Sequence, residues 1–168
     1  MTDFVTAETG IRQLHARYVD AVWRKDMDAF ADCFTEDAEW RIAGLVLRTR
    51  KEIDSTIRRM MSHGPPPVYL TFQAPILDVG AGVVSGRTYV TETNTLLEGK
   101  PAFSIGVYYE RFVDGGDRWR FSWRLFQVHY LGPPDMSGRF FEREDFGPPP
   151  NMPPADAKSY NHTGMHAG

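Results

Sequence analysis

The spacing of apolar residues changes once along this chain, from a helical period to a strand period, and this change restricts the fold more than any other feature. Over residues 11–23 the apolar side chains recur every three or four positions, which places them on one face of a helix. From Val68 onward they recur at every second position. Helices followed by consecutive hairpin-linked strands predict an α+β fold, in which the helices cover one face of an antiparallel sheet.

Two further helices are predicted before this change of period. Asp26 is suited to cap a short helix over residues 26–33. The run Thr49-Arg50-Lys51-Glu52 has the pattern of a capping box that opens a third helix. Residues 38–42 alternate as a strand between these two helices. The other predicted strands cover residues 68–79, 83–97, 103–113 and 119–130.

The composition changes abruptly at Gly132. Residues 132–168 are dense in proline and poor in periodic apolar positions, so we do not expect a second core there. We predict one domain over residues 1–131 and a proline-rich arm over residues 132–168. The arm could lie extended on the body or on a partner subunit, or it could be loose beyond about residue 150. Its candidate anchors are Phe140, Phe141 and Phe146.

Bulk composition argues against several classes of partner. The net charge is −3 at pH 7, so the chain has no basic field for nucleic acid or for an anionic membrane surface. No apolar run approaches the roughly 20 residues that cross a bilayer, and the N-terminus does not resemble a secretory signal. The single cysteine, Cys33, excludes an internal disulfide and indicates a reducing compartment. We therefore expect a cytoplasmic protein.

The sequence has no P-loop, GxGxxG, GxSxG or Cys-pair motif. His162 and His166 are four residues apart, but the glycines of that segment disfavour the helix that a metal site with this spacing requires. Cys33 is interpreted as a small buried residue rather than a nucleophile. We expect neither a metal nor a cofactor.

Strand parity indicates a polar pair. In regular strands, Glu92 shares a face with Val90, and Arg124 shares a face with Phe126. If both faces turn toward the helices, Glu92 and Arg124 meet in an apolar interior, where a buried carboxylate needs a cationic partner. Such a pair could serve a reaction or only stabilise the fold, and with the opposite parity both charges face solvent. His129 falls on the face opposite Arg124 unless a bulge intervenes.

His15 lies on the apolar stripe of the first helix. Two interpretations remain open for this residue. It can be a hydrogen-bonded core histidine, which is the commoner role for a histidine on an apolar face, or it can be a catalytic base.

Three segments together resemble the SnoaL-like family of the nuclear transport factor 2-like superfamily. They are Ile11…Leu14…Tyr18, residues 26–40, and residues 119–138 with Trp119, Arg124 and Tyr130. The resemblance covers about residues 8–140. It implies a cone-shaped, curved antiparallel sheet wrapped around three N-terminal helices, with a pocket at the open end. Members include scytalone dehydratase, a hexachlorocyclohexane dehydrochlorinase and polyketide cyclases, while others only bind ligands or proteins. Many form dimers or trimers through the outer sheet face.

The resemblance also implies site residues. The dehydratase branch uses an aspartate late in the first helix and a histidine on the strand after the third helix. Those positions hold Trp23 and Tyr69 here, so the dyad is missing, although Asp20 is an alternative acid one turn earlier. The arginine of the last strand is retained as Arg124. The implied pocket positions are Tyr18, Val19, Trp23, Trp40, Val90, Glu92, Ile105 and Tyr109.

Two hypotheses for function follow. In the first, the protein is a cofactor-independent lyase, isomerase or cyclase that acts on a small, mostly apolar or aromatic organic molecule. Glu92 is then the general base, and Arg124 and Tyr69 stabilise oxyanion charge. In the second, the pocket binds its ligand without catalysis, which the missing dyad favours. A protein-binding module that uses the outer sheet face is a third alternative. A homo-oligomer, either a dimer or a trimer, is expected from the resemblance.

Overall fold

A computed structural model of the chain describes residues 3–62, 68–80, 83–95 and 101–160. The elements in chain order are α1 (Phe4–Arg24), α2 (Met27–Ala31), β1 (Phe34–Ile42), β2 (Leu45–Arg48), α3 (Arg50–Ser62), β3 (Tyr69–Phe72), β4 (Ile76–Val79), β5 (Val84–Thr95), β6 (Pro101–Asp114), β7 (Trp119–Gly132) and β8 (Arg139–Phe140). His162 and His166, together with the loops over residues 63–67 and 96–100, lie outside the described residues.

The strands form one curved, unclosed sheet of eight strands, and the α+β prediction is confirmed. The strand order is β2-β1-β7-β6-β5-β3, with β4 paired to β5 and β8 paired to β7. One correction is needed, because β1 runs parallel to β7 and the sheet is therefore mixed. Neighbouring strands joined by hairpins must be antiparallel, whereas β1 and β7 are far apart in sequence and no hairpin sets their relative direction.

The predicted strand over residues 68–79 is divided into two. β3 and β4 both pair with β5 in antiparallel register, β3 from Tyr69 to Phe72 and β4 from Ile76 to Val79. Pro75 lies between them and has no amide hydrogen to donate, which explains the interruption. Pro75 thus separates the two strands at one edge of the sheet.

The helices begin where side chains can cap them. α1 starts at Phe4, earlier than the periodicity indicated, because Asp3 accepts a hydrogen bond from the Thr6 amide at 3.0 Å. Asp26 caps α2 as predicted, by accepting from the Ala29 amide at 3.0 Å. Thr49 accepts from the Glu52 amide at 3.3 Å, which is one half of the predicted capping box at α3. The Glu52 carboxylate accepts instead from the Arg48 amide.

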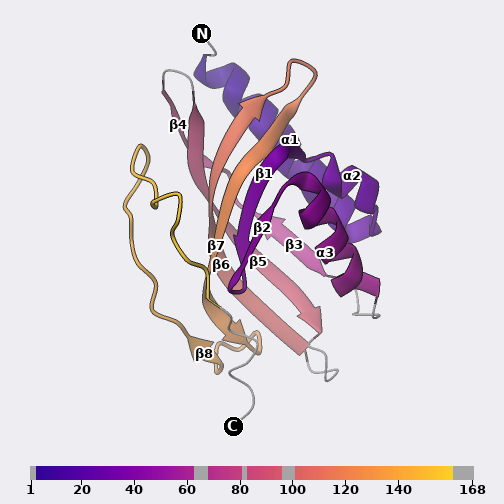
Figure 1. The fold of residues 1–168 in the computed structure, drawn as a ribbon. Coiled ribbons are helices and arrows are strands. Elements are labelled where there is room, and N and C mark those ends of the chain that lie inside the picture. Colours follow the sequence, from indigo (N-terminus) through magenta and orange to yellow (C-terminus); the bar gives the residue numbers. More distant parts are fainter. Residues whose placement is uncertain (1–2, 63–67, 81–82, 96–100, 161–168) are drawn as a thin grey trace.

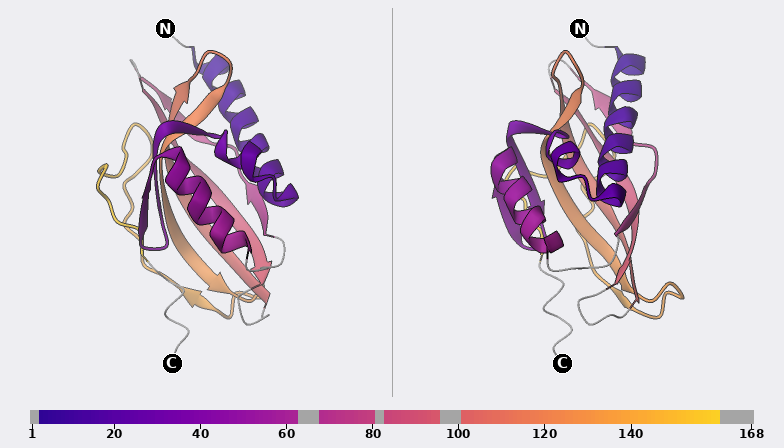
Figure 2. Two further views of the ribbon diagram at one scale, coloured as in Figure 1. Left: turned by 45° about the vertical axis from the view of Figure 1, so that its right-hand side comes forward. Right: turned by 90° about the vertical axis from the view of Figure 1, so that its right-hand side faces the viewer.

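The helices lie on the inner face of the curved sheet, and the C-terminal arm lies on the outer face (Figures 1 and 2). The inner core combines the buried stripe of α1 with side chains from β1, β5, β6 and β7. Its largest members include Ile11, Leu14, Tyr18, Phe30, Phe34, Trp40, Tyr108, Phe112 and Phe121. The arrangement agrees with a sheet whose apolar face is covered by amphipathic helices.

The arm contacts the sheet of its own chain through the outer cluster. This cluster consists of Val107, Tyr109, Trp123 and Leu125, and Phe146, Met152 and Ala157 of the arm pack against it. The Trp123 indole Nε1 donates to the Ala155 carbonyl at 3.3 Å, and Arg41 donates to the Ala157 carbonyl at 2.9 Å. The outer face of the sheet is therefore covered, over the described part of the arm, by residues of the same chain.

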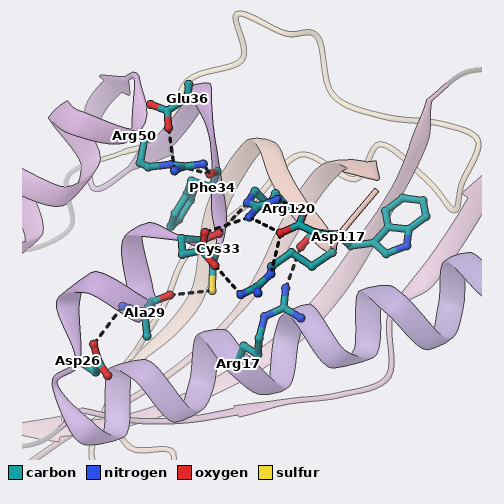
Figure 3. A network of polar contacts seen from close by, with 12 residues as sticks. Arg17, Asp26, Ala29, Cys33, Phe34, Glu36, Arg50, Asp117 and Arg120 are labelled. Atoms are coloured by element: carbon teal, nitrogen blue, oxygen red, sulfur yellow. Dashed lines mark hydrogen bonds and ion pairs between the residues drawn. The ribbon is translucent and has the colours of Figure 1, made fainter. Parts of the chain in front are cut away.

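A network of polar contacts fixes β7 against the first half of the chain (Figure 3). Arg120 donates to the Asp32 carbonyl at 3.1 Å and to the carboxylates of Asp32 and Asp117 at 3.0 and 2.8 Å. Arg17 of α1 donates to the Trp119 carbonyl at 2.9 Å. These contacts hold α1, the end of α2 and the start of β7 together.

Two bulges interrupt the alternation of β7. Phe121 pairs with Phe112 and Trp123 pairs with Arg111, so Ser122 is an extra residue. A second irregularity leaves His129 without a partner between Val128 and Tyr130. Regular alternation along β7 would place Phe121 on the face opposite Arg124, and the bulge at Ser122 changes this. Phe121 and Arg124 both belong to the inner face, while Trp123 and Leu125 belong to the outer cluster.

Candidate functional site

A fully buried ion pair lies between the sheet and α1. Arg124 of β7 and Glu110 of β6 are opposite each other in the strand register and have 0% exposed side chains. Nε of Arg124 donates to Glu110 Oε1 at 2.9 Å, and Nη2 lies 2.9 Å from the same oxygen. Glu110 Oε2 accepts from the Thr88 hydroxyl at 2.8 Å and lies 3.0 Å from His15 Nε2. Both carboxylate oxygens are therefore engaged by partners from three different elements.

Aromatic rings enclose the guanidinium of Arg124. Its Cζ lies 3.9 Å from the ring centroid of Tyr108, 4.1 Å from that of Phe121 and 4.5 Å from that of Tyr18. Trp40 and Phe72 lie further away, at 5.6 and 5.9 Å. Contacts of a cation with ring faces are attractive, most of all where water is excluded. Arg124 is thus stabilised by one carboxylate and by several rings rather than by solvent.

Burial and charge act against each other in this cluster. Burial alone would raise the pKa of Glu110, but His15, Arg124 and Thr88 outweigh it, and the pKa lies below its ordinary value. Burial raises the pKa of the hydroxyls of Tyr18 and Tyr108, and the negative charge of Glu92 adds to both shifts. The tyrosine hydroxyls are therefore neutral, and Glu110 is an ionised carboxylate, at neutral pH.

A groove of about 590 Å³ lies beside this cluster, between α1 and the segment from β3 to Pro75. Its volume falls in the range of small-molecule sites. The lining residues on the helix are Arg12, His15, Ala16, Val19, Asp20 and Trp23, and those on the strand side are Leu70, Thr71, Phe72, Gln73, Ala74 and Pro75. Most of these side chains are apolar, and His15 links the groove to the buried ion pair.

The residues at the two expected dyad positions form one edge of this region. The rings of Trp23 and Tyr69 meet edge to face with their centroids 4.6 Å apart. They are half exposed, at 50% and 42%. A tryptophan cannot accept a proton from a substrate, so this pair offers an aromatic surface in place of an acid and a base.

Glu92 and Arg124 face the same side of the sheet, but the partner of Arg124 differs from the expected one. Glu92 is half-buried on β5, between its register partners Leu70 and Ser104, and its charge acts on Tyr18 and Tyr108. The carboxylate that binds Arg124 belongs to Glu110. A carboxylate in the adjacent strand and in register reaches the guanidinium directly, which explains the difference.

The other predicted pocket residues divide between the two faces. Tyr18, Trp40 and Val90 are buried in the inner core, and Val19 packs against that core and lines the groove. Tyr109 belongs to the outer cluster and meets Phe146 of the arm edge to face at 5.4 Å. Ile105 precedes Val107 by two residues and shares its face. The placement of Tyr109 and Ile105 in the pocket is therefore corrected, since the inward side chain at this point of β6 is Tyr108.

Glu110 is the site residue that the sequence analysis missed. It stands in an apolar strand, at Tyr108-Tyr109-Glu110, and a lone acid in such a strand signals a buried, paired carboxylate. Simple hairpin counting from the turn after Asp114 places Glu110 opposite Trp123, and the bulge at Ser122 moves it opposite Arg124. The pairing therefore depends on a local irregularity that strand alternation does not reveal.

Within the described residues, no group of three or more His, Cys, Asp or Glu side chains could hold a metal ion. No helix in that part of the chain is long and apolar enough to cross a membrane. Burial raises the pKa of the Cys33 thiol to about 11, so this cysteine is not an activated nucleophile.

Similar folds occur among solved structures. A hexachlorocyclohexane dehydrochlorinase of type 2 has 18% identity and a TM-score of 0.70, over 83% of this chain and 95% of that one. The type 3 enzyme from Novosphingobium barchaimii LL02 has 19% identity and a TM-score of 0.69, over 83% and 97%. A function-unknown protein from Mycobacterium tuberculosis has 22% identity and a TM-score of 0.63, over 78% and 76%. At these identities the likeness concerns the fold alone.

No curated protein matches the chain. The family model for the SnoaL-like domain matches residues 3–124, from the start of α1 to the buried arginine of β7. This range contains the three helices, the groove and the Glu110–Arg124 pair, and it ends before the arm. The nuclear transport factor 2-like architecture predicted from the sequence is confirmed by the fold and by the structures that resemble it. The chain belongs to the SnoaL-like domain family.

Proposed function

We propose that this protein binds a small, mostly apolar organic molecule in the groove between α1 and β3. The observation that carries the proposal is the groove itself, which has a suitable volume and an apolar lining. The half-exposed ring of Trp23 supplies an aromatic wall at one end, and Arg12, Asp20 and Gln73 supply polar groups that can orient a ligand. A cyclic or aromatic ligand suits a surface of this kind.

Catalysis by a cofactor-independent lyase, isomerase or cyclase is the reaction class that we propose for this site. Proton abstraction from carbon requires a base beside the ligand and positive charge or hydrogen-bond donors that stabilise the resulting anion. Arg124 is enclosed by Glu110 and by aromatic rings, so we assign it to holding that carboxylate in place rather than to contact with a ligand. Tyr69 and Glu92 stay candidates for direct roles, at the exposed edge of β3 and on the inner face of β5.

Binding without catalysis is the second candidate function. It is favoured by two observations: Arg124 and Thr88 engage the carboxylate oxygens of Glu110 inside the fold, and the dyad positions hold Trp23 and Tyr69. A carrier or accessory protein needs the groove but not a base. Under either proposal, a homo-oligomer would have to form through surfaces other than the outer cluster that the arm covers.

Ala16→Phe tests the groove as the binding site. Ala16 is an exposed helical residue of the groove wall, so a phenyl ring there fills the groove without entering the core. Ser55→Phe adds the same ring at an exposed position of α3, outside the groove, and serves as the matched control. Native mass spectrometry of the purified protein, and quenching of tryptophan fluorescence by a panel of small cyclic ketones that includes 2-tetralone, measure binding.

We expect saturable binding by the wild type and by Ser55→Phe, and at least a tenfold weaker affinity of Ala16→Phe, about 1.4 kcal/mol or more. Equal affinities of the two variants would place the ligand elsewhere. No co-purified molecule together with no saturable binding by any ketone of the panel would contradict the proposed function.

A further inference from the structure

Among the described residues, His15 both lines the groove and contacts the carboxylate of the buried ion pair. Its side chain is only 6% exposed, and its ring packs against Phe72, Phe112 and Phe121 at centroid distances of 5.1 to 5.9 Å. The same residue forms part of the groove wall, beside Ala16 and Phe72. The three phenylalanines pack around the imidazole and restrict its orientation.

The hydrogen bonds of Glu110 determine which ring nitrogen of His15 carries a proton. Arg124 donates to Oε1, while Thr88 donates to Oε2, which also lies 3.0 Å from His15 Nε2. An ionised carboxylate only accepts hydrogen bonds, so Nε2 must carry the hydrogen of a neutral imidazole. The other nitrogen, Nδ1, then has a free lone pair. Nδ1 is buried and has no hydrogen-bond partner among the described residues.

A buried imidazole with this pattern has the properties of a general base. The carboxylate orients the ring, fixes its tautomer and stabilises the positive charge that appears when Nδ1 accepts a proton. The guanidinium of Arg124 keeps the carboxylate ionised and positioned by engaging its other oxygen. If His15 only filled the core, its unpaired buried nitrogen would lower the stability of the fold without serving any function.

We propose that His15, positioned by Glu110, is the base that takes a proton from a ligand in the groove, in place of Glu92. This inference rests on the proposed function of the groove. The ligand class is a small cyclic molecule with an acidic C–H bond beside a carbonyl or another electron-withdrawing group. The C–H bond breaks, the proton moves to Nδ1, and the electron pair stays on the ligand as an enolate or a stabilised carbanion. The imidazolium that forms is paired with the carboxylate of Glu110.

The proton on Nδ1 then has two balanced fates. It can move to another carbon of the ligand, which gives isomerisation, or it can exchange with solvent, so that in D₂O a deuteron is returned to the same carbon, which gives exchange. Alternatively, the carbanion expels a leaving group with its bonding electrons, which gives elimination, and the imidazolium loses its proton to water. In both cases the histidine returns to its starting state, and neither route needs an oxidant or a reductant.

Hydrogen–deuterium exchange at the acidic C–H positions of 2-tetralone measures the proposed step directly, in D₂O by proton NMR. We expect the wild type to accelerate exchange, and His15→Gln to lose about 100-fold or more of that acceleration. Glutamine retains a donor for Glu110, so the variant should fold, and exchange rates are compared at saturating 2-tetralone so that a change in affinity does not enter the comparison. His129→Gln, which removes a histidine of β7 outside the groove, is the matched control and should exchange at the wild-type rate.

Three results of the exchange experiment would overturn the assignment of His15. The first is a wild-type exchange rate in folded His15→Gln. The second is loss of the accelerated exchange in Glu92→Gln while His15→Gln still accelerates it. The third is that 2-tetralone bound to the wild type exchanges no faster than 2-tetralone in buffer. Failure of the panel to bind at all would instead contradict the proposed function. The NMR shifts of the imidazole nitrogens in ¹⁵N-histidine-labelled protein give a readout that needs no ligand. We expect a protonated Nε2 and an unprotonated Nδ1 on His15, and the opposite tautomer would refute the proposal.

Discussion

Removal of the buried arginine is the sharpest test of how this fold is held together. In Arg124→Met a flexible apolar side chain replaces the guanidinium, and its thioether can still pack against the surrounding rings of Tyr18, Tyr108 and Phe121. What is lost is the cation opposite Glu110, whose side chain is 0% exposed. The variant must then either bury an uncompensated carboxylate or protonate it.

The size of the effect follows from that burial. Removing one partner of a buried ion pair destabilises a protein by about 3–5 kcal/mol. The free energy of unfolding of a domain is only about 5–15 kcal/mol, so the variant should be folded but close to its limit. With a urea m-value of about 2 kcal/mol per M, the expected loss corresponds to a fall of about 2 M in the urea midpoint.

Urea unfolding followed by far-UV circular dichroism measures this quantity. Arg12→Met is the matched control, because Arg12 is 55% exposed and pairs with Glu8 at 2.9 Å within α1. It should change the free energy of unfolding by less than about 1 kcal/mol. In the double variant Arg124→Met/Glu110→Gln no charge is left unpaired, so part of the loss should be recovered. A midpoint for Arg124→Met within about 0.5 M of the wild type would refute the account of the pair.

Three further predictions concern protonation, reactivity and the arm. Because the pKa of Glu110 lies below the ordinary value of 4.5, its stabilising effect is present above that pH and is lost as the pH falls. The stability advantage of the wild type over Glu110→Gln should therefore shrink below pH 4.5 in urea titrations, and a constant difference would contradict this. Cys33 has a thiol pKa of about 11, so it should resist iodoacetamide at about pH 8 in the folded protein and react with one equivalent in urea. Intact-mass measurement follows the labelling, and rapid labelling of the folded protein would contradict the burial of this thiol. Deletion of residues 133–168 should expose the outer cluster of Val107, Tyr109, Trp123 and Leu125 and lower the free energy of unfolding by about 2–4 kcal/mol. Light scattering should then detect self-association of the truncated protein. A monomer of unchanged stability would show that the arm does not protect this face.

The elements of the fold could be predicted from local signals. The stripe Ile11, Leu14, His15 and Tyr18 makes one face of α1 apolar, and Asp26 offers a carboxylate to the first amides of α2. These signals depend on residues within a few positions of each other. The same is true of the antiparallel pairing of β5, β6 and β7, because each pair is joined by a short connection.

The candidate site was harder to predict because its members come from distant parts of the chain. Alternation placed Glu92 and Arg124 on one side of the sheet, which the structure bears out. It could not choose between Glu92 and Glu110 as the partner of Arg124, because the bulge at Ser122 shifts the register of β7 by one residue. Nor could it place Tyr109, since β6 is apolar on both faces once the arm covers the outer one.

The sequence by itself determined the helices and most of the strands, because these follow from periodicity, capping or turn chemistry within short stretches, and the resemblance of three segments to the SnoaL-like family implied the architecture. The tertiary structure alone decided that β1 lies parallel to β7, that Arg124 pairs with Glu110, and that His15 meets this pair at the wall of the groove. The physical reason is that these contacts join residues up to about a hundred positions apart. Their geometry is set by the curvature of the sheet and by its bulges, which leave no periodic trace in the amino-acid order.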